Sequence, residues 1–193
     1  NLSNSTMGIH LDSNKVKGVD ASTGSLGHGL SIALGTALAA KVLGKDYKTF
    51  CILGDGECDE GSNWEAGMAA AHFKADNLIA FVDRNKCMID GPTEEVMKLE
   101  PFCDKWRSFG FHVIEVDGHN LNELSEAIDY ALGEPDAPVM IVANTIKGAG
   151  IDFMEDDYHW HYGAIDEGKY QQAKESLEKY YKERVARAEK EGI

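Results

Sequence analysis

The sequence predicts an α/β fold, a three-layer sandwich built around a mainly parallel sheet. Two short apolar runs bounded by turn residues occur at 49–53 and 78–82, and a segment rich in Ala, Glu, Met and Trp separates them at 60–75. Apolar runs of this length are typical of strands buried on both faces of a parallel sheet, and the intervening segment has the composition of a helix. A strand–helix–strand order of this kind indicates an α/β protein.

The remaining segments continue the alternation of helices and strands. A Gly- and Ala-rich helix is predicted at 26–43 and ends before Gly44, a residue favoured just beyond a helix. Residues 1–20 have no periodicity and are predicted as a loop-rich entry. Further elements are predicted as a helix near 102–108, a strand at 112–116, a helix at 122–132, a strand at 139–143 and a long C-terminal helix at 166–191. The mixed Lys and Glu of that last helix indicate a solvated face.

Length and charge restrict the classes of function. The chain has 193 residues and is predicted as one domain over 1–193, and its 33 acidic against 19 basic residues give a formal net charge of −14. This charge argues against a nucleic-acid partner, which requires a basic face. No apolar run has the length of a membrane span, and no signal peptide is visible. The cysteines lack zinc-like pairing and are predicted to be free thiols in a cytoplasmic protein: Cys51, Cys58, Cys87 and Cys103.

Polar groups suited to a metal follow the two apolar runs. Asp55 comes directly after the first predicted strand, between Gly54 and Gly56, and Asn85 comes shortly after the second. Ligands of parallel sheets bind beyond the carboxyl ends of the strands, and Mg²⁺ prefers a carboxylate, a neutral oxygen and phosphate oxygens. The carbonyl of Cys87 is a third candidate ligand. The alternative for the Gly-Asp-Gly tripeptide alone is an ordinary turn without a ligand.

Three blocks together resemble the thiamine diphosphate motifs of the transketolase family. The match extends from about His10 to Gly163 and covers most of the chain in order. It is most similar to the amino-terminal subunit of a split, two-chain transketolase, which implies the thiamine diphosphate-binding fold and, within it, the diphosphate-binding domain. The family normally has further residues before this point, so the sequence is expected to be amino-terminally incomplete. The matching blocks are 54–66 with 85–91, then 18–29, and then 106–119.

The resemblance assigns roles to individual residues. It implies that Asp55, Asn85 and the Cys87 carbonyl bind the metal. Catalytic roles are implied for His161, beside the reacting carbonyl, for His10, which would contact substrate, and for Glu60, in a relay between two cofactors. Simpler interpretations are a helix-terminal carboxylate for Glu60, a hydrophobic staple for Leu26 and an exposed position for His159. The implied cofactor-binding residues are Gly24, Leu26, Gly54, Asp55, Gly56, Glu57, Asn85, Ile89 and His161.

The resemblance also implies an activity and a partner. The expected reaction is transfer of a two-carbon ketol unit between sugar phosphates, with thiamine diphosphate and Mg²⁺, or Ca²⁺ or Mn²⁺ in its place. Thiamine diphosphate supplies the carbanion and the electron sink. No segment resembles the pyrimidine-binding domain, so the complete site is expected to need a carboxy-terminal subunit, in an assembly with two copies of each chain.

Two alternatives stay open. The first is an enzyme similar to 1-deoxyxylulose-5-phosphate synthase, which shares the metal motif; the Glu60-Gly61 and Trp64-Glu65-Ala66 context argues against it. The second is a non-catalytic subunit that binds the cofactor as a scaffold. A calcium EF-hand loop is imitated by Asp55, Glu57 and Asp59 and is excluded, because Glu60 stands where that loop requires glycine.

Overall fold

The computed structural model describes residues 6–133 and 135–191. The described residues form two compact units. The first, which we call the sheet unit, comprises residues 6–84 and 99–144. The second, the hairpin unit, comprises residues 85–98 and 145–191. The prediction of one domain over 1–193 stays a prediction.

The sheet unit contains a four-stranded sheet in the order β1-β2-β6-β5. All three strand pairs are parallel, and the register places Thr49 beside Leu78 and Ile79 beside Val139. The two central strands are the most apolar and the most deeply buried, as expected for strands covered on both faces. The strands are β1 (Thr49–Gly54), β2 (Leu78–Arg84), β5 (His112–Asp117) and β6 (Val139–Asn144).

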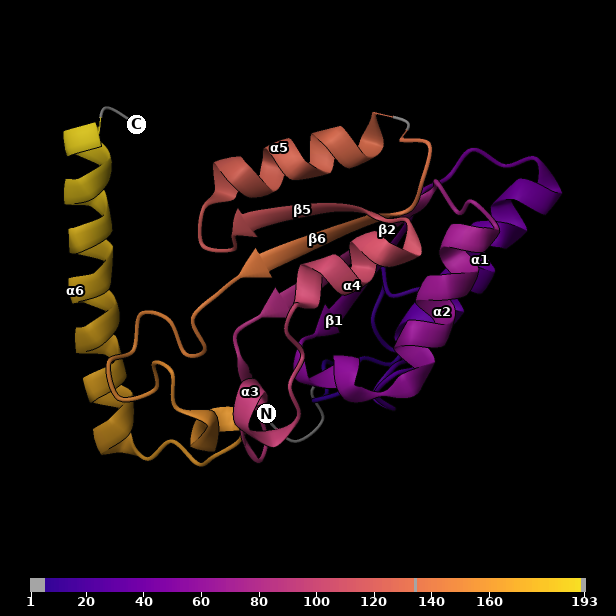
Figure 1. Cartoon of the computed structure of the whole chain (residues 1–193). Coiled ribbons are helices and arrows are strands. Elements are labelled where there is room, and N and C mark those ends of the chain that lie inside the picture. Colours follow the sequence, from indigo (N-terminus) through magenta and orange to yellow (C-terminus); the bar gives the residue numbers. More distant parts are fainter. Residues whose placement is uncertain (1–5, 134, 192–193) are drawn as a thin grey trace. The chain divides into compact units, whose positions relative to one another are not determined.

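Helices cover both faces of this sheet, which confirms the α/β prediction. Helix α5 (Leu121–Leu132) lies over β5 and β6, and three helices lie on the opposite face (Figure 1). Side chains on β2 alternate between the two layers: Ile79 packs in the core beneath α5, and Ala80 packs in the core on the other side. The helices of that other side are α1 (Gly29–Leu43), α2 (Gly61–His72) and α4 (Phe102–Phe109).

Local sequence explains where these helices end and how closely they pack. Gly44 ends α1 with φ 60° and donates its N–H to the last turn. The Asn120 side chain accepts N–H bonds from Asn122 and Glu123 and so caps α5. Gly67 of α2 lies against Trp106 of α4, where a Cβ atom would come 2.8 Å from the ring. Only glycine permits this approach of helix to aromatic ring.

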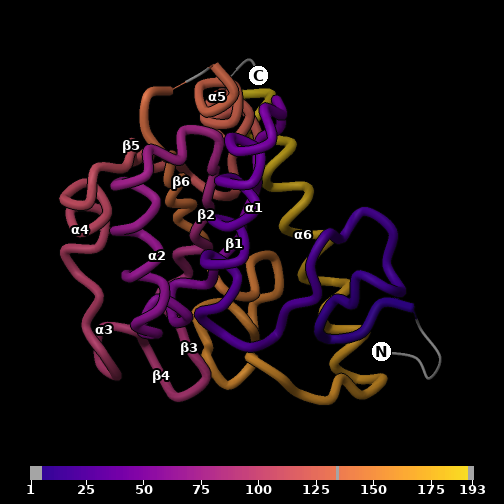
Figure 2. Tube along the Cα trace, turned by 90° about the vertical axis from the view of Figure 1, so that its right-hand side faces the viewer, coloured from indigo at the N-terminus to yellow at the C-terminus, as the bar shows by residue number. Residues whose placement is uncertain are grey.

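The hairpin unit holds short elements within segments whose sequence predicts loop. Strands β3 (Cys87–Met88) and β4 (Gly91–Pro92) pair antiparallel, with Cys87 opposite Pro92, and lie side by side in Figure 2. A single turn of helix, α3 (Thr93–Val96), follows. The unit also contains a 3₁₀ turn, η2 (Tyr158–His161), and the long helix α6 (Glu167–Glu191).

Most predicted boundaries agree with the structure to within three residues. Helix α1 begins at Gly29 rather than at Leu26, so Leu26 lies in the preceding loop. The segment predicted as one helix from Glu60 to Ala75 is shorter, and a 3₁₀ turn, η1 (Gly56–Asp59), precedes it. Residues 6–20 contain no helix or strand, and residues 1–5 lie outside the described part. Among the described helices, none is both long and apolar enough to cross a membrane.

Candidate cofactor and metal site

Asp55 lies immediately beyond the carboxyl end of β1. Its backbone N–H donates to the carbonyl of Asp83 at 3.2 Å, which extends the pairing of β1 with β2 by one residue. The carboxylate is buried, with 1% of the residue exposed, and accepts the N–H of Gly56 at 2.7 Å. It thereby caps η1, because an aspartate at this position satisfies a donor that the short helix leaves unpaired.

A buried arginine pairs with Asp55. Nη1 of Arg84 lies 3.1 Å from Oδ2 of Asp55, and both side chains are almost fully buried, at 3% and 1% exposure. Nη2 of Arg84 lies 2.8 Å from Oε1 of Glu100, whose side chain is 56% exposed. A buried carboxylate without a partner would be costly. The ion pair with Arg84 gives the buried Asp55 carboxylate the partner that its burial requires.

Glu57 joins the Gly-Asp-Gly turn to the glycine-rich loop. Its two carboxylate oxygens accept the N–H groups of Gly27, at 3.0 Å, and Gly54, at 3.1 Å. Ser62 donates its hydroxyl to the carbonyl of Gly27 at 2.8 Å. Gly27 has φ 82°, and a Cβ atom there would come 2.7 Å from Cβ of Glu60. The loop can therefore approach η1 and α2 this closely only because residue 27 is glycine. The hydrogen bonds that Glu57 accepts hold the loop in this position.

The remaining predicted residues of the sheet unit surround this loop. A Cβ atom on Gly24 would come 2.9 Å from the ring of His10, so His10 lies against the backbone of the loop. Leu26 is 58% exposed, which does not support the staple interpretation. Glu60 stands at the amino-terminal cap of α2 and is exposed; its side chain makes no capping hydrogen bond there. The structure thus brings His10, Gly24, Leu26, Asp55, Glu57 and Glu60 into one unit.

The hairpin unit brings together the other predicted residues. Oδ1 of Asn85 accepts the N–H of Cys87 at 3.0 Å, which starts the turn into β3. Both β3 and β4 contact η2, the turn that contains His161. Ile89, between the two strands, is 52% exposed, and His161 is exposed. The peptide bond between Arg84 and Asn85 connects this group to the end of β2.

Aromatic contacts of Trp160 hold η2 in place. The Trp160 ring lies 5.3 Å from the Phe153 ring, centroid to centroid, and Nζ of Lys169 lies 4.8 Å from the centroid of Trp160. His159 is 71% exposed and pairs with Asp157 at 2.7 Å, as expected for a surface histidine. The hydrogen bond from His159 holds the pKa of Asp157 below its ordinary value.

The donor groups fit a magnesium site. The described residues contain no group of three or more His, Cys, Asp or Glu side chains that could hold a metal ion. The proposed ligands are of another kind, one carboxylate, one amide oxygen and one backbone carbonyl, which are the hard oxygen donors that Mg²⁺ prefers. A carboxylate offers about four lone-pair positions, so Asp55 can share its oxygens between hydrogen bonds and a metal.

Comparison with known proteins identifies the family of the chain. The family model for the thiamine diphosphate-binding domain of transketolase matches residues 1–186. The chain belongs to the transketolase family. The resemblance inferred from the motifs is therefore confirmed.

Similar proteins include chains named as transketolase subunits. A subunit of the apulose-4-phosphate transketolase of Phocaeicola vulgatus is 41% identical over 180 residues, which are 92% of this chain and 62% of that protein. The 6-deoxy-6-sulfo-D-fructose transketolase subunit SqwG of a Clostridium species is 45% identical over 170 residues, 88% of this chain and 62% of that protein. The chain thus spans less than two thirds of these relatives.

A solved structure of the family agrees with the fold. The crystal structure of transketolase from Campylobacter jejuni has a TM-score of 0.83 and is 30% identical. The match covers 91% of this chain and 28% of that one. The predicted fold class is therefore confirmed.

Sequence reasoning missed Arg84, Glu100 and Ser62 in this transketolase domain. Arg84 continues the two-residue spacing of Leu78, Ala80 and Val82, which all face the same helical layer. That spacing could have indicated from the sequence that Arg84 points into the protein. Glu57 was expected to bind cofactor, and in the structure it holds two backbone N–H groups of the surrounding loops. Its contribution to a cofactor site would be to position the glycine-rich loop.

Burial controls the thiols near the site. The pKa of Cys51 is raised to about 12, chiefly by burial, and burial also raises the pKa of Cys58, whose Sγ lies 3.5 Å from the carbonyl of Gly54. At pH 8 a thiol of pKa near 12 is a thiolate in only about one molecule in 10⁴. We expect Cys51 and Cys58 to resist a disulfide reagent until the chain unfolds. Peptide mass spectrometry after timed labelling checks this, and rapid labelling of Cys58 in the folded chain would contradict it.

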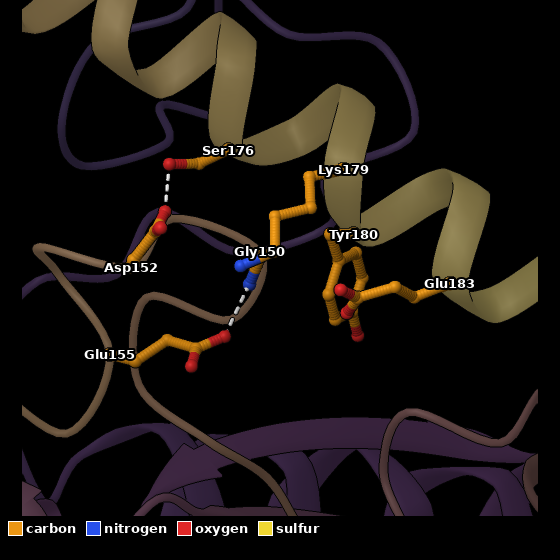
Figure 3. A pocket seen from close by; sticks show the side chains of 7 residues that line it. All are labelled: Gly150, Asp152, Glu155, Ser176, Lys179, Tyr180 and Glu183. Carbon is orange, nitrogen blue, oxygen red and sulfur yellow. Dashed lines mark hydrogen bonds between the residues drawn. The ribbon is translucent and has the colours of Figure 1, made fainter.

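A separate pocket lies within the hairpin unit, between the loop at 148–155 and α6. It has a volume of about 130 Å³, and its lining side chains point inward from both segments (Figure 3). Glu155 accepts the N–H of Gly150 at 2.8 Å, and Ser176 donates to Asp152. The first bond lies within the loop and the second attaches α6 to it, so we interpret the pocket as structural. It is lined by Gly150, Asp152, Glu155, Ser176, Lys179, Tyr180 and Glu183.

Proposed function

We propose that this chain is the thiamine diphosphate-binding subunit of a two-chain transketolase. The reaction would be Mg²⁺-dependent transfer of a two-carbon ketol unit between sugar phosphates. This is the type of carbohydrate conversion that occurs in the pentose phosphate pathway. Membership of the family and similarity to proteins named as transketolase subunits support this. The two named relatives act on different sugars, so no single donor or acceptor is assigned.

One observation carries the proposal. Asp55 follows β1 and Asn85 follows β2, and these strands are parallel neighbours in register, with Gly54 beside Asp83. Carboxyl ends of neighbouring parallel strands are where ligands of such sheets bind. We therefore propose that Asp55, Asn85 and the Cys87 carbonyl hold the divalent metal. Proposed contacts to the cofactor come from Gly24, Leu26, Gly54, Gly56, Glu57, Ile89 and His161.

The proposed catalytic roles follow from the chemistry of the side chains. When bound, thiamine diphosphate would supply the carbanion and the electron sink. His161 would polarise or protonate the oxygen of the reacting carbonyl, and His10 would contact substrate. Glu60 would link the site to a second copy across the subunit interface. The exposure of all three side chains supports these roles, because each is accessible to a substrate or partner.

The exposed surface of the sheet unit supports a partner subunit. Helix α1 has no charged side chain before Lys41, and three of its apolar residues are exposed: Ile32 (44%), Val42 (85%) and Leu43 (66%). Leu26, beside this helix in sequence, is also exposed. Surface helices normally present charged residues outward, and exposed apolar faces mark interfaces. The partner would carry the pyrimidine-binding domain, in an assembly of two copies of each chain.

The decisive test is reconstitution. We expect the purified chain to show no ketol transfer when given Mg²⁺, thiamine diphosphate and a ketose phosphate donor, because no part of it resembles the aminopyrimidine pocket or the sugar-phosphate clamp. Addition of the pyrimidine-domain subunit should restore activity and tighten cofactor binding together, since both need the same composite site. Coupled spectrophotometric assay and titration calorimetry measure the two. Steady-state ketol transfer by the single chain would refute the two-chain proposal.

The same experiment separates the alternatives. A scaffold subunit would tighten cofactor binding by its partner without adding turnover. An enzyme similar to 1-deoxyxylulose-5-phosphate synthase would instead release carbon dioxide from an α-keto acid donor. We retain a cytoplasmic location as a prediction, which the four free cysteines favour.

A further inference from the structure

Arg84 is a buried cation that contacts the proposed metal ligand. It lies between two carboxylates, Asp55 at 3.1 Å and Glu100 at 2.8 Å, and its own side chain is 3% exposed. Buried arginines with two acidic partners are positioned by those partners and fix them in return. The arrangement lies entirely within the sheet unit.

The fold directs Arg84 inward. It is the last residue of β2 and continues the row of Leu78, Ala80 and Val82 that faces α1, α2 and α4. Its guanidinium lies 5.3 Å from the centroid of the Phe102 ring. The second oxygen of Glu100 accepts the N–H of Phe102 at 2.8 Å, at the start of α4. Arg84 therefore ties the end of β1 to the beginning of α4.

The charge of Arg84 affects what Asp55 can bind. A buried carboxylate attracts a divalent cation strongly, and a guanidinium paired with it weakens that attraction; Arg84 divides its charge between Asp55 and Glu100, so it compensates Asp55 only in part. A divalent cation approaching Asp55 alone would also be repelled by Arg84. A diphosphate adds negative charge, which offsets this repulsion.

We propose that Arg84 is a positioning residue that orients the Asp55 carboxylate and makes divalent-cation binding depend on the diphosphate. The inference rests on the proposed function, because it takes Asp55 as the metal ligand. Its consequence is that the chain discriminates against free divalent cations and accepts the metal together with the cofactor.

The role of Arg84 can be tested by binding Mn²⁺ to the purified chain without thiamine diphosphate. Electron paramagnetic resonance of the free ion measures the binding. Wild type should bind weakly at Asp55. Arg84→Met should tighten Mn²⁺ binding by about tenfold or more, because the repelling charge is gone. Arg84→Lys keeps the charge and should stay within about threefold of wild type. A purely structural role would lower affinity on substitution, so a gain distinguishes the two.

Two controls assign the effect to this site. Arg107→Met removes an arginine that also bridges two carboxylates, Asp104 and Glu115, on the surface, and should leave Mn²⁺ affinity unchanged. Adding Asp55→Ala to Arg84→Met should abolish the gained binding. Should Arg84→Met unfold, Arg84→Gln retains a donor toward Asp55 without the charge. If both Arg84→Met and Arg84→Gln unfold and Mn²⁺ restores their folding, the proposal is supported. If Mn²⁺ does not restore folding, the proposal is refuted.

The outcomes separate this inference from the proposed function. If the complex with the partner subunit binds Mn²⁺ with thiamine diphosphate but the neutral variants bind Mn²⁺ alone no better than wild type, the role of Arg84 is refuted and the metal site stands. If the wild-type complex with the partner subunit binds no Mn²⁺ even with thiamine diphosphate, the proposed function itself fails.

Discussion

Replacement of Asp55 by alanine is expected to abolish Mg²⁺-dependent binding of thiamine diphosphate to the assembled enzyme. Asp55 is the one charged side chain among the three proposed ligands, and the Asn85 amide and the Cys87 carbonyl are neutral. Neutral oxygens cannot replace the attraction of a carboxylate for a divalent ion that must give up water. Isothermal titration of the cofactor in the presence of Mg²⁺ should show no saturable binding.

The buried pair with Arg84 makes a folding control essential. Removing one partner of a buried ion pair costs about 3–5 kcal/mol, so the circular dichroism and unfolding midpoint of Asp55→Ala must be measured beside its affinity. Asp55→Asn preserves the side-chain shape and an acceptor for the Gly56 N–H, and should lose cofactor binding while staying closer to wild type in stability. Asp104→Ala, which removes a surface carboxylate paired with Arg107, should change neither. A folded Asp55→Ala chain with unchanged cofactor affinity would remove Asp55 from the site.

Replacement of His161 by alanine is expected to lower turnover by about 10²–10⁴-fold, the usual contribution of an acid–base group. Cofactor affinity should change much less, because the proposed role of the imidazole is to polarise or protonate the reacting oxygen. His161 lies exposed in η2, the turn that contacts the β3–β4 hairpin. Steady-state kinetics of the reconstituted complex at saturating cofactor, together with calorimetry, measure the two effects separately.

His159 provides the matched control, since it stands two positions away in the same turn. It is exposed and pairs with Asp157, and His159→Ala should leave turnover within about twofold of wild type, as is usual for a surface position. Equal turnover for His161→Ala and wild type at saturating cofactor would show that His161 is a surface histidine without a catalytic role. A parallel loss in both variants would instead indicate that η2 itself had been disturbed.

Local pattern in the sequence was enough to predict the architecture. The apolar runs at 49–53 and 78–82 form β1 and β2, as predicted. Strands buried on both faces of a sheet are continuous apolar runs, which are easy to identify in a sequence. Gly44 ended the first helix because a left-handed residue there satisfies the last carbonyls. The candidate ligands Asp55 and Asn85 could be named because residues that follow parallel strands share one edge of the sheet.

Short turns near the site were not predictable in the same way. The β3–β4 hairpin has two residues in each strand, and η1 and η2 have four residues each, too few for any hydrophobic period to register. The prediction of one helix across 60–75 was too long for a related reason. Composition marks the helical centre of a segment, whereas capping and packing decide its ends.

Only the tertiary structure showed what holds the candidate site in place. Glu57 accepts an N–H from Gly27, 30 positions earlier, and Ser62 donates to the carbonyl of the same residue, 35 positions away. Arg84 joins Asp55 and Glu100, which are separated from it by 29 and 16 positions. Sequence by itself determined the four strands of the sheet, the longer helices and the polar residues at the strand ends, because each depends on neighbours within a few positions. The partners of those polar residues were decided by how the sheet and helices pack, since that packing brings together side chains that no local pattern relates.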